Sequence, residues 1–205
     1  CLSAVGWGSE VGIHPQSEWN NPEPEIVLAV NSRGETVGAT LGNDVNLRDF
    51  EGRSALLLGR AKDNNASAAL GPMIRLFDAG FTLEDVRRAE LSLSITGRDG
   101  FELAESGAVG AISRDPADVV AQMIGAHHQY PDGAVLYLGT PFSPAKDRGA
   151  PGMGFTHHEG DVVRIESARL GVLVNEVDRT DECPPWRYGI GALFASLAAR
   201  GLPRP

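Results

Sequence analysis

Residues 23–44 read EPEIVLAVNSRGETVGATLGND, and the expected architecture starts from this stretch. The apolar run after Glu25 is short and rich in β-branched residues, which favours a strand over a helix. Residues 31–34 (NSRG) supply turn-forming side chains, and a second strand-like run extends from Thr36 to Leu41. The stretch therefore predicts a β-hairpin.

The register of this hairpin predicts where its acidic side chains lie. A two-residue loop of Arg33 and Gly34 would pair residues whose numbers sum to 67. Glu23 then lies opposite Asp44, and Glu25 shares the face of Glu23 because side chains two apart on a strand point the same way. The opposite face carries residues that we expect in a core: Ile26, Leu28 and Val30.

Three carboxylates at one end of a hairpin need a positive partner. Directly opposed carboxylates destabilise a strand pair unless a counter-charge is present. The hairpin contains no Cys and no His, and hard oxygen ligands favour Mg²⁺, Mn²⁺ or Ca²⁺ over zinc. Glu23, Glu25 and Asp44 are therefore candidate metal ligands. The alternative is an acidic hairpin end that is simply solvated.

The composition limits the classes of fold and partner. A chain of 205 residues with 42% hydrophobic content can bury one substantial core, and it lacks the apolar run of about 20 residues that spans a bilayer. A net charge of −9 argues against nucleic acid or an anionic membrane as a partner. Two cysteines are too few for a disulfide scaffold, which favours a reducing cytoplasm.

The first residue is Cys1 and not Met. We expect Cys1 to mark a processing or truncation boundary. A nucleophilic N-terminal thiol is the alternative, although no partner residues for that chemistry are evident.

The rest of the chain is expected to add strands and short helices. Leu91, Leu93 and Ile95 alternate with polar residues, and Thr82 and Asp85 have the spacing of a helix capping box. Further expectations are an irregular segment at residues 1–22, a short helix or buried strand ending near Gly59, a helix from Pro116 to before Tyr130, strands at residues 134–138, 161–166 and 171–177, and an amphipathic helix at residues 190–200. Because strands outnumber helices, we expect a β-rich α+β fold around one core.

Three other residues are candidates for catalysis or substrate binding. Lys62 could handle protons or anchor an anion, and its pKa would fall in a desolvated cleft beside a divalent cation. Arg48 could pair with a ligand carboxylate, with the substrate, or with Asp49 or Glu51. Thr140 follows a strand and offers a hydroxyl to a carboxylate.

The histidine pairs do not form a metal site by their spacing. His127-His128 is expected at a helix end and His157-His158 in a glycine-rich loop. Since neighbouring residues on a helix do not share a face, structural or surface roles are expected for all four.

Several motifs, in their order along the chain, resemble the fumarylacetoacetate hydrolase superfamily. They are residues 17–25 (SEWNNPEPE), 38–49 (GATLGNDVNLRD), 58–65 (LGRAKDNN), 70–72 (LGP) and 139–141 (GTP). The resemblance implies a mixed β-sandwich roll, a homodimer, and a 2-oxo acid as small-molecule substrate. It also implies that Glu23, Glu25 and Asp44 hold Mg²⁺, Mn²⁺ or Ca²⁺, with Lys62 and Thr140 in the active site.

The short interval between Glu25 and Asp44 is most similar to the branch that dehydrates 2-keto-3-deoxy-pentonates. That branch has an additional N-terminal domain, so residues 1–205 would form one catalytic domain, and an N-terminal half of the same precursor is a possible partner. The expected reaction is loss of a C3 proton and then of the C4 hydroxyl, with the enolate stabilised by the cation. Lys62 would serve as acid, base or anchor, and Arg48 would orient the substrate.

Three alternatives remain open. An acylpyruvate-type C–C hydrolase would need a His and Glu pair to activate water, and His14 is the only upstream histidine, with no matching Glu. Oxaloacetate decarboxylation would use the same enolate. A catalytically silent, metal-stabilised subunit is an alternative of another class.

Overall fold

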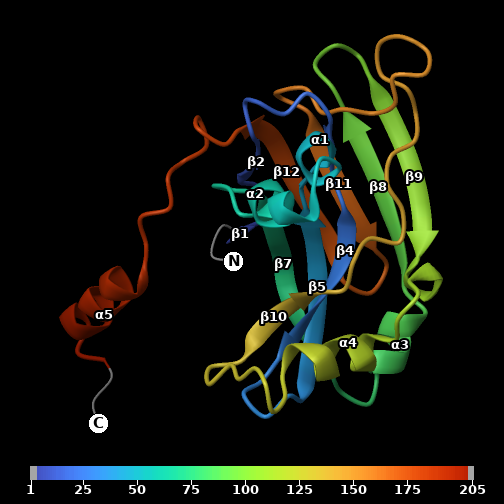
Figure 1. Cartoon of the computed structure of the whole chain (residues 1–205). Coiled ribbons are helices and arrows are strands. Elements are labelled where there is room, and N and C mark those ends of the chain that lie inside the picture. Colours follow the sequence, from blue (N-terminus) through green and yellow to red (C-terminus); the bar gives the residue numbers. More distant parts are fainter. Residues whose placement is uncertain (1–3, 203–205) are drawn as a thin grey trace.

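The computed structural model describes residues 4–202, so Cys1 lies outside the described residues. Two five-stranded sheets pack face to face, with short helices at the edges and ends of the sheets (Figure 1). This arrangement confirms the predicted β-rich α+β fold and its mixed β-sandwich form. Among the helices described, none is long and apolar enough to cross a bilayer.

The first sheet contains the predicted hairpin at its centre. Its strands, in spatial order, are β1 (Ala4–Val5), β7 (Ala68–Leu76), β5 (Thr36–Asp44), β4 (Pro24–Val30) and β10 (Ala134–Tyr137). All neighbours are antiparallel except β1 and β7.

The second sheet is also mixed. Its strands, in spatial order, are β2 (Glu10–Ile13), β12 (Gly171–Arg179), β11 (Val162–Ser167), β8 (Glu90–Thr96) and β9 (Glu102–Ala108). Only β2 and β12 are parallel. A small third sheet pairs β3 (Asn20–Asn21) with β6 (Asn46–Leu47), directly beside the acidic end of the hairpin.

The helices are short and lie outside the sheets. They are α1 (Arg48–Glu51), the 3-10 turn η1 (Ala55–Leu57), α2 (Leu58–Lys62), α3 (Leu83–Arg87), the 3-10 turn η2 (Val109–Ala111), α4 (Pro116–Met123) and α5 (Ile190–Ala199). The predicted start signals are confirmed at two of them: Thr82 and Asp85 form a capping box for α3, and the Asp115 side chain accepts from Ala117 N at the start of α4.

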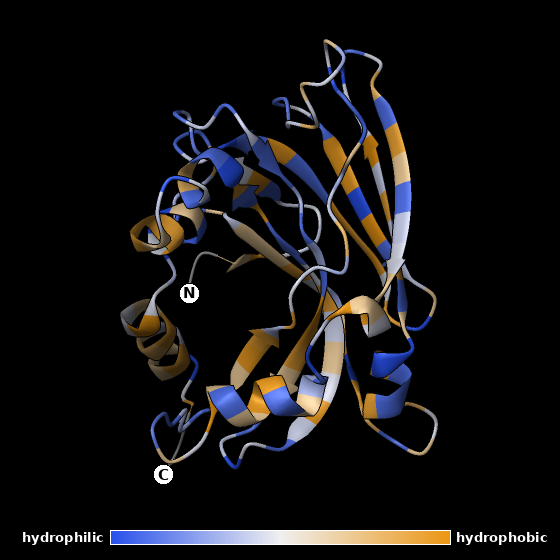
Figure 2. Cartoon of the chain, turned by 45° about the vertical axis from the view of Figure 1, so that its right-hand side comes forward, coloured by the Kyte–Doolittle hydropathy of each residue, from blue (hydrophilic) through white to orange (hydrophobic). Residues whose placement is uncertain are grey.

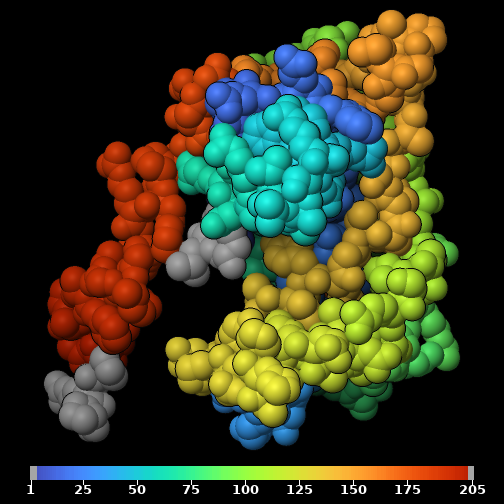
Figure 3. All heavy atoms as spheres, viewed as in Figure 1, coloured from blue at the N-terminus to red at the C-terminus, as the bar shows by residue number. Residues whose placement is uncertain are grey.

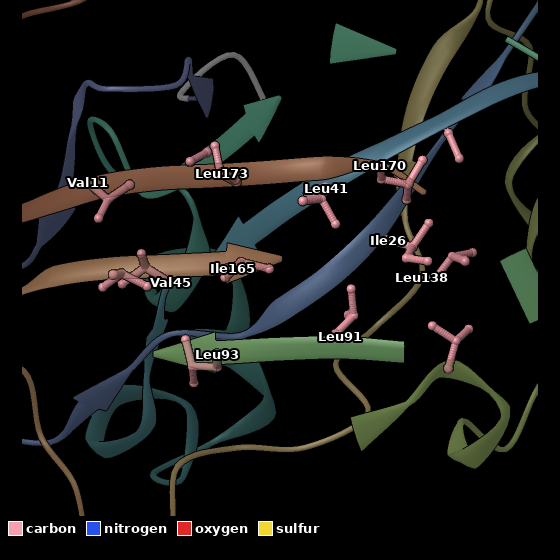
Figure 4. Packing of buried hydrophobic residues seen from close by; sticks show 14 of the residues in the cluster. Val11, Ile26, Leu41, Val45, Leu91, Leu93, Leu138, Ile165, Leu170 and Leu173 are labelled. Atoms are coloured by element: carbon pink, nitrogen blue, oxygen red, sulfur yellow. The ribbon is translucent and has the colours of Figure 1, made fainter. Parts of the chain in front are cut away.

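The core lies between the two sheets. Alternation along the strands sends one set of side chains inward, and the predicted inward face of β4 is buried in the main cluster together with the apolar side chains of β8. Figure 4 shows side chains from both sheets meeting there, among them Ile26, Leu41, Leu93, Ile165 and Leu173. In Figure 2 the alternation appears as bands of hydrophobic and hydrophilic colour along the strands.

The hairpin has the predicted register but a different turn. Asn31 N donates to Glu35 O, and Gly34, with φ +79°, closes a three-residue loop, so the predicted two-residue loop is wrong. A β-bulge beside Val30 then adds one residue to β5. From Ala29 and Gly38 onward, the paired residues have numbers that sum to 67, as predicted.

Three further expectations are corrected. The segment at residues 1–22 is not irregular throughout, because β1, β2 and β3 lie within it. The helical segment after Ala55 does not end near Gly59 but continues to Lys62. Finally, α5 is not the amphipathic helix that was predicted. Ser196 is its only polar side chain, and none of its residues is buried.

Candidate functional site

The hairpin brings the three predicted carboxylates together. Glu23 and Glu25 flank the start of β4, and Asp44 ends β5, where its backbone N donates to Glu23 O over 3.0 Å. One carboxylate oxygen from each of the three residues lies within 4.8 Å of the other two. We call this cluster of Glu23, Glu25 and Asp44 the acidic triad.

Lys62 supplies the positive charge beside the acidic triad. It lies at the end of α2, and its Nζ is 2.5 Å from Glu23 Oε2 and 3.0 Å from Asp44 Oδ2. Burial alone would lower the pKa of Lys62, but the charges of Glu23 and Asp44 outweigh it and the pKa is raised. The two carboxylate neighbours therefore favour the ammonium form of Lys62, and the fall in pKa expected beside a divalent cation stays a prediction.

Burial shifts the pKa of two carboxylates of the acidic triad. Burial raises the pKa of Glu25 to about 8, and burial also raises the pKa of Glu23, although Lys62 opposes that shift. The protein therefore holds at least one carboxylate in a place where its ionised form is costly. A bound divalent cation would favour that ionised form.

The donor set fits a hard divalent cation. All three side chains offer carboxylate oxygens, the ligand type of Mg²⁺, Mn²⁺ and Ca²⁺, and the described residues add neither Cys nor His to the cluster. Asn46 orients Glu23 from outside, since its Nδ2 donates to Glu23 Oε1 at 3.1 Å and to Glu51 Oε2 at 2.8 Å. Hydrogen bonds of this kind fix the direction of a ligand carboxylate.

The turn after β10 approaches the acidic triad from the other side. Gly139, with φ +95°, donates its backbone N–H to Glu25 Oε2 at 2.7 Å. The hydroxyl of Thr140 lies within hydrogen-bond distance of Pro24 O (3.0 Å) and Phe142 O (2.6 Å). Thr140 is thus at the site, with a hydroxyl that would have to turn from the backbone to donate to a substrate carboxylate.

Arg48 is not brought to the acidic triad. Its guanidinium lies over the ring of Trp19, 5.5 Å from the centroid. Of its other predicted partners, Asp49 accepts from Ser17 Oγ and from Glu18 N, and Glu51 accepts from Asn46. The arginine therefore stacks on an aromatic ring at the rim of the site.

Tyr137 is a site residue that the sequence reasoning missed. From β10 its side chain crosses the sheet, and its hydroxyl donates to Ala69 O on β7 at 2.8 Å. The ring passes over Gly42, where an added Cβ would lie 2.5 Å from a ring carbon. Burial raises the pKa of Tyr137, and the charges of Asp44 and Glu25 raise it further. A glycine within a strand often marks such a close approach and was the available signal.

His157 and His158 have the structural and surface roles expected of them, whereas His127-His128 lies beyond the end of α4 at Met123 and not at a helix end as predicted. His157 is fully buried and its Nδ1 is 3.0 Å from Asp161, which also binds Arg148. His158 pairs with Asp99 at the surface. The Nδ1 of His14 accepts from Gln16 N, and its ring meets Phe50 edge-on.

The chain is similar to proteins of known activity over most of its length. It is 32% identical over 170 residues to the probable 2-keto-3-deoxyxylonate dehydratase of Haloferax volcanii, covering 83% of this chain and 55% of the relative. It is 28% identical over 175 residues to the 2-dehydro-3-deoxy-D-arabinonate dehydratase of Saccharolobus solfataricus, covering 85% and 55%. The chain thus spans about half the length of these relatives.

A solved structure shares the fold. The 2-keto-3-deoxy-D-arabinonate dehydratase complexed with magnesium and 2,5-dioxopentanoate superposes with a TM-score of 0.71 at 25% identity, over 86% of this chain and 59% of that chain. The family model described as fumarylacetoacetate (FAA) hydrolase C-terminal matches residues 3–178. Residues 3–178 thus correspond to the C-terminal domain of fumarylacetoacetate hydrolases, and the chain belongs to that family.

Proposed function

We propose that this chain is the catalytic domain of a divalent-metal-dependent dehydratase that acts on a 2-keto-3-deoxy sugar acid. The observation that carries the proposal is the acidic triad with Lys62 beside it, in a family member whose relatives include two dehydratases of such acids. Mg²⁺, Mn²⁺ or Ca²⁺ at the acidic triad would polarise the 2-oxo group and stabilise the enolate.

The side chains around the acidic triad would divide the remaining tasks. Lys62 would hold the anionic substrate through its ammonium group. Alternatively it would act as base and acid in turn: as a neutral amine, Nζ would take the C3 proton and then return a proton to the departing C4 hydroxyl, which leaves as water. Thr140 would bind the substrate carboxylate once its hydroxyl turns away from Phe142 O. Arg48 would help to orient the substrate only if its guanidinium left the ring of Trp19.

The environment of Glu25 supports a role in holding a cation. Gly139 N fixes one of its oxygens, and the ring of Tyr137 covers the neighbouring strand, so Glu25 is buried on a rigid platform. A ligand held in this way keeps its geometry while the substrate exchanges.

Hydrolysis of an acylpyruvate is the competing function in the same family. It needs an activated water, and within the described residues His14 accepts from a backbone N–H and has no hydrogen bond to a carboxylate. The two dehydratase relatives favour dehydration over hydrolysis. Oxaloacetate decarboxylation stays a third option through the same enolate.

The test is an assay of the purified protein with Mg²⁺ against 2-keto-3-deoxy-pentonate and acetylpyruvate, run in parallel with Glu25→Gln. We expect dehydration of the pentonate by the unmodified protein, its loss on chelation of the metal, and its loss in Glu25→Gln. Turnover of acetylpyruvate without dehydration would replace the proposal by the hydrolase function. Turnover of neither compound would favour a metal-stabilised subunit without activity of its own.

A further inference from the structure

The C-terminal part of the chain stands clear of the rest of the protein. After the buried Cys183, residues 184–202 leave the sandwich as an extended segment and end in α5; we call residues 184–202 the arm, and the described residues before it the body. Figures 1 and 3 show the arm beside the body, with open space between α5 and the sheets. The family match ends at residue 178, so the arm lies beyond the matched region.

The arm is far too apolar for an exposed segment. Ser196 is the only polar side chain in α5, and Figure 2 shows the helix in hydrophobic colours. The large exposed side chains of the arm are Trp186 (55%), Tyr188 (59%), Ile190 (67%), Leu193 (38%), Phe194 (62%) and Leu202 (49%). A ten-residue helix is marginal on its own in water, and a helix that is apolar all round is normally buried. The arm therefore needs a surface to cover it.

The body offers a matching surface at the edge of the first sheet. β1 pairs with β7 only at Ala68 and Ala69, and within the described residues the rest of that edge has no neighbouring strand. This open edge carries three large exposed side chains: Met73 (78%), Ile74 (45%) and Leu76 (64%). Exposed apolar side chains at an unpaired edge mark an interaction site.

The charges of the arm and the body are complementary. The 22 residues after Cys183 contain three arginines and no acidic residue. Since the whole chain carries −9 and these residues carry +3, the rest of the chain carries −12. A second copy of the body would therefore attract the arm.

The available area suits a stable dimer. Large aromatic side chains bury about 150–250 Å² each, so covering the exposed parts of the arm removes roughly 500 Å² of its surface from water. Each arm also covers a similar area of the body that receives it. Two exchanged arms would bury about 2,000 Å² in all, at the upper end of the range of standard interfaces.

We propose that two copies of this chain exchange their arms, with α5 of each copy docked on the open β7 edge of its partner. Reciprocal exchange gives a closed two-fold dimer in which both apolar surfaces are covered. The receiving β7 edge lies within the matched family region, whereas the arm lies beyond it, so the exchange would be a contact particular to chains that carry such an arm.

The test is sedimentation equilibrium of the 205-residue protein at tens of micromolar, at low and high salt. We expect a dimer, a ten-fold or larger rise in the dimer dissociation constant in the double variant Ile190→Asp/Phe194→Asp, a similar rise in Met73→Asp, and weaker association at high salt. Ala104→Asp is the matched control, since it adds the same charge at an exposed position of β9 in the other sheet. Circular dichroism checks folding, which should persist because these side chains are exposed in the protomer.

Three results would overturn the proposal. They are a monomeric unmodified protein, a dimer that persists unchanged in the arm variant, and open-ended oligomers that do not close at two copies. If Met73→Asp dimerises like the control while the arm variant does not dimerise, the β7 edge is refuted as the receiving surface.

Discussion

The ammonium nitrogen of Lys62 lies 2.5 Å from Glu23 Oε2, on the side of the acidic triad that faces α2. The same nitrogen contacts Asp44 Oδ2 at 3.0 Å, so one lysine balances two of the three carboxylates. The predicted divalent cation and this ammonium group are both counter-charges for the same oxygens. The stability of the site without metal should therefore depend on Lys62.

Replacing Lys62 with methionine should destabilise the metal-free protein by about 2 kcal/mol, because it leaves half-buried carboxylates without a partner. Mg²⁺ should recover most of this loss, since a ligand that binds only the folded state stabilises it. Urea denaturation in EDTA and in Mg²⁺ measures both effects. Lys146→Met, at an exposed position away from the acidic triad, is the control, and its stability should not depend on Mg²⁺. Equal stability of Lys62→Met and the unmodified protein in EDTA would refute the role of Lys62 as counter-charge.

Gly42→Ala should destabilise the protein by about 1–3 kcal/mol, the usual cost of overpacking. The new Cβ would meet the Tyr137 ring and Val27 Cγ2, each at 2.5 Å. Thermal unfolding measures the loss, and adding Tyr137→Leu should recover part of it. Gly59→Ala in α2 is the matched control, since nothing lies within 4 Å of its Cβ position. It should be neutral or slightly stabilising. A Gly42→Ala variant as stable as this control would contradict the close packing of Tyr137.

The free energy of unfolding should fall in two separate pH ranges as the solution is acidified, because of the buried cluster of His157, Asp161 and Arg148. Burial lowers the pKa of His157, so the unfolded state binds more protons below about pH 6.5 and stability falls there. Burial alone would raise the pKa of Asp161, but hydrogen bonds from His157 and Arg148 lower it to about 2. The stability that Asp161 contributes is thus complete above about pH 4 and is lost as the pH falls towards 2.

Denaturation curves between pH 7 and pH 3 measure both stages. Asp161→Asn should be less stable at pH 7 by about 3 kcal/mol, because Arg148 loses a buried partner, and its stability should fall less steeply below pH 4. An unchanged slope between pH 4 and pH 3 in Asp161→Asn would show that other carboxylates dominate acid unfolding.

The hairpin shows why part of the site could be predicted from the sequence. The register was predicted from a two-residue loop at Arg33 and Gly34, and the alternation along β4 correctly placed Ile26 and Leu28 on the core face. The turn itself was mispredicted, yet the bulge beside Val30 compensates for the extra loop residue and leaves Glu23 next to Asp44. The predicted register is therefore correct because the extra loop residue and the bulge offset each other, and neither feature was predicted from the sequence.

Other parts of the site depend on contacts that local patterns do not encode. Lys62 reaches the acidic triad from α2, and Tyr137 crosses from β10 to Ala69, which are both tertiary relationships. Arg48 was expected near the ligands by its distance along the chain, but the ring of Trp19 holds it at the rim. The helix α5 was predicted, but as an amphipathic helix, because its lack of a partner within the protomer could only be seen in three dimensions.

The most direct test of the central claim is calorimetric titration of the protein with Mg²⁺, in the unmodified form and as Glu25→Gln and Glu35→Gln. Both substitutions remove one carboxylate from the same hairpin, but Glu25 belongs to the acidic triad and Glu35 pairs with Arg33 in the exposed loop. We predict one Mg²⁺ per chain, an affinity at least 100-fold weaker in Glu25→Gln, and an unchanged affinity in Glu35→Gln. Equal Mg²⁺ affinity in Glu25→Gln and the unmodified protein would contradict the assignment of the acidic triad as the metal site.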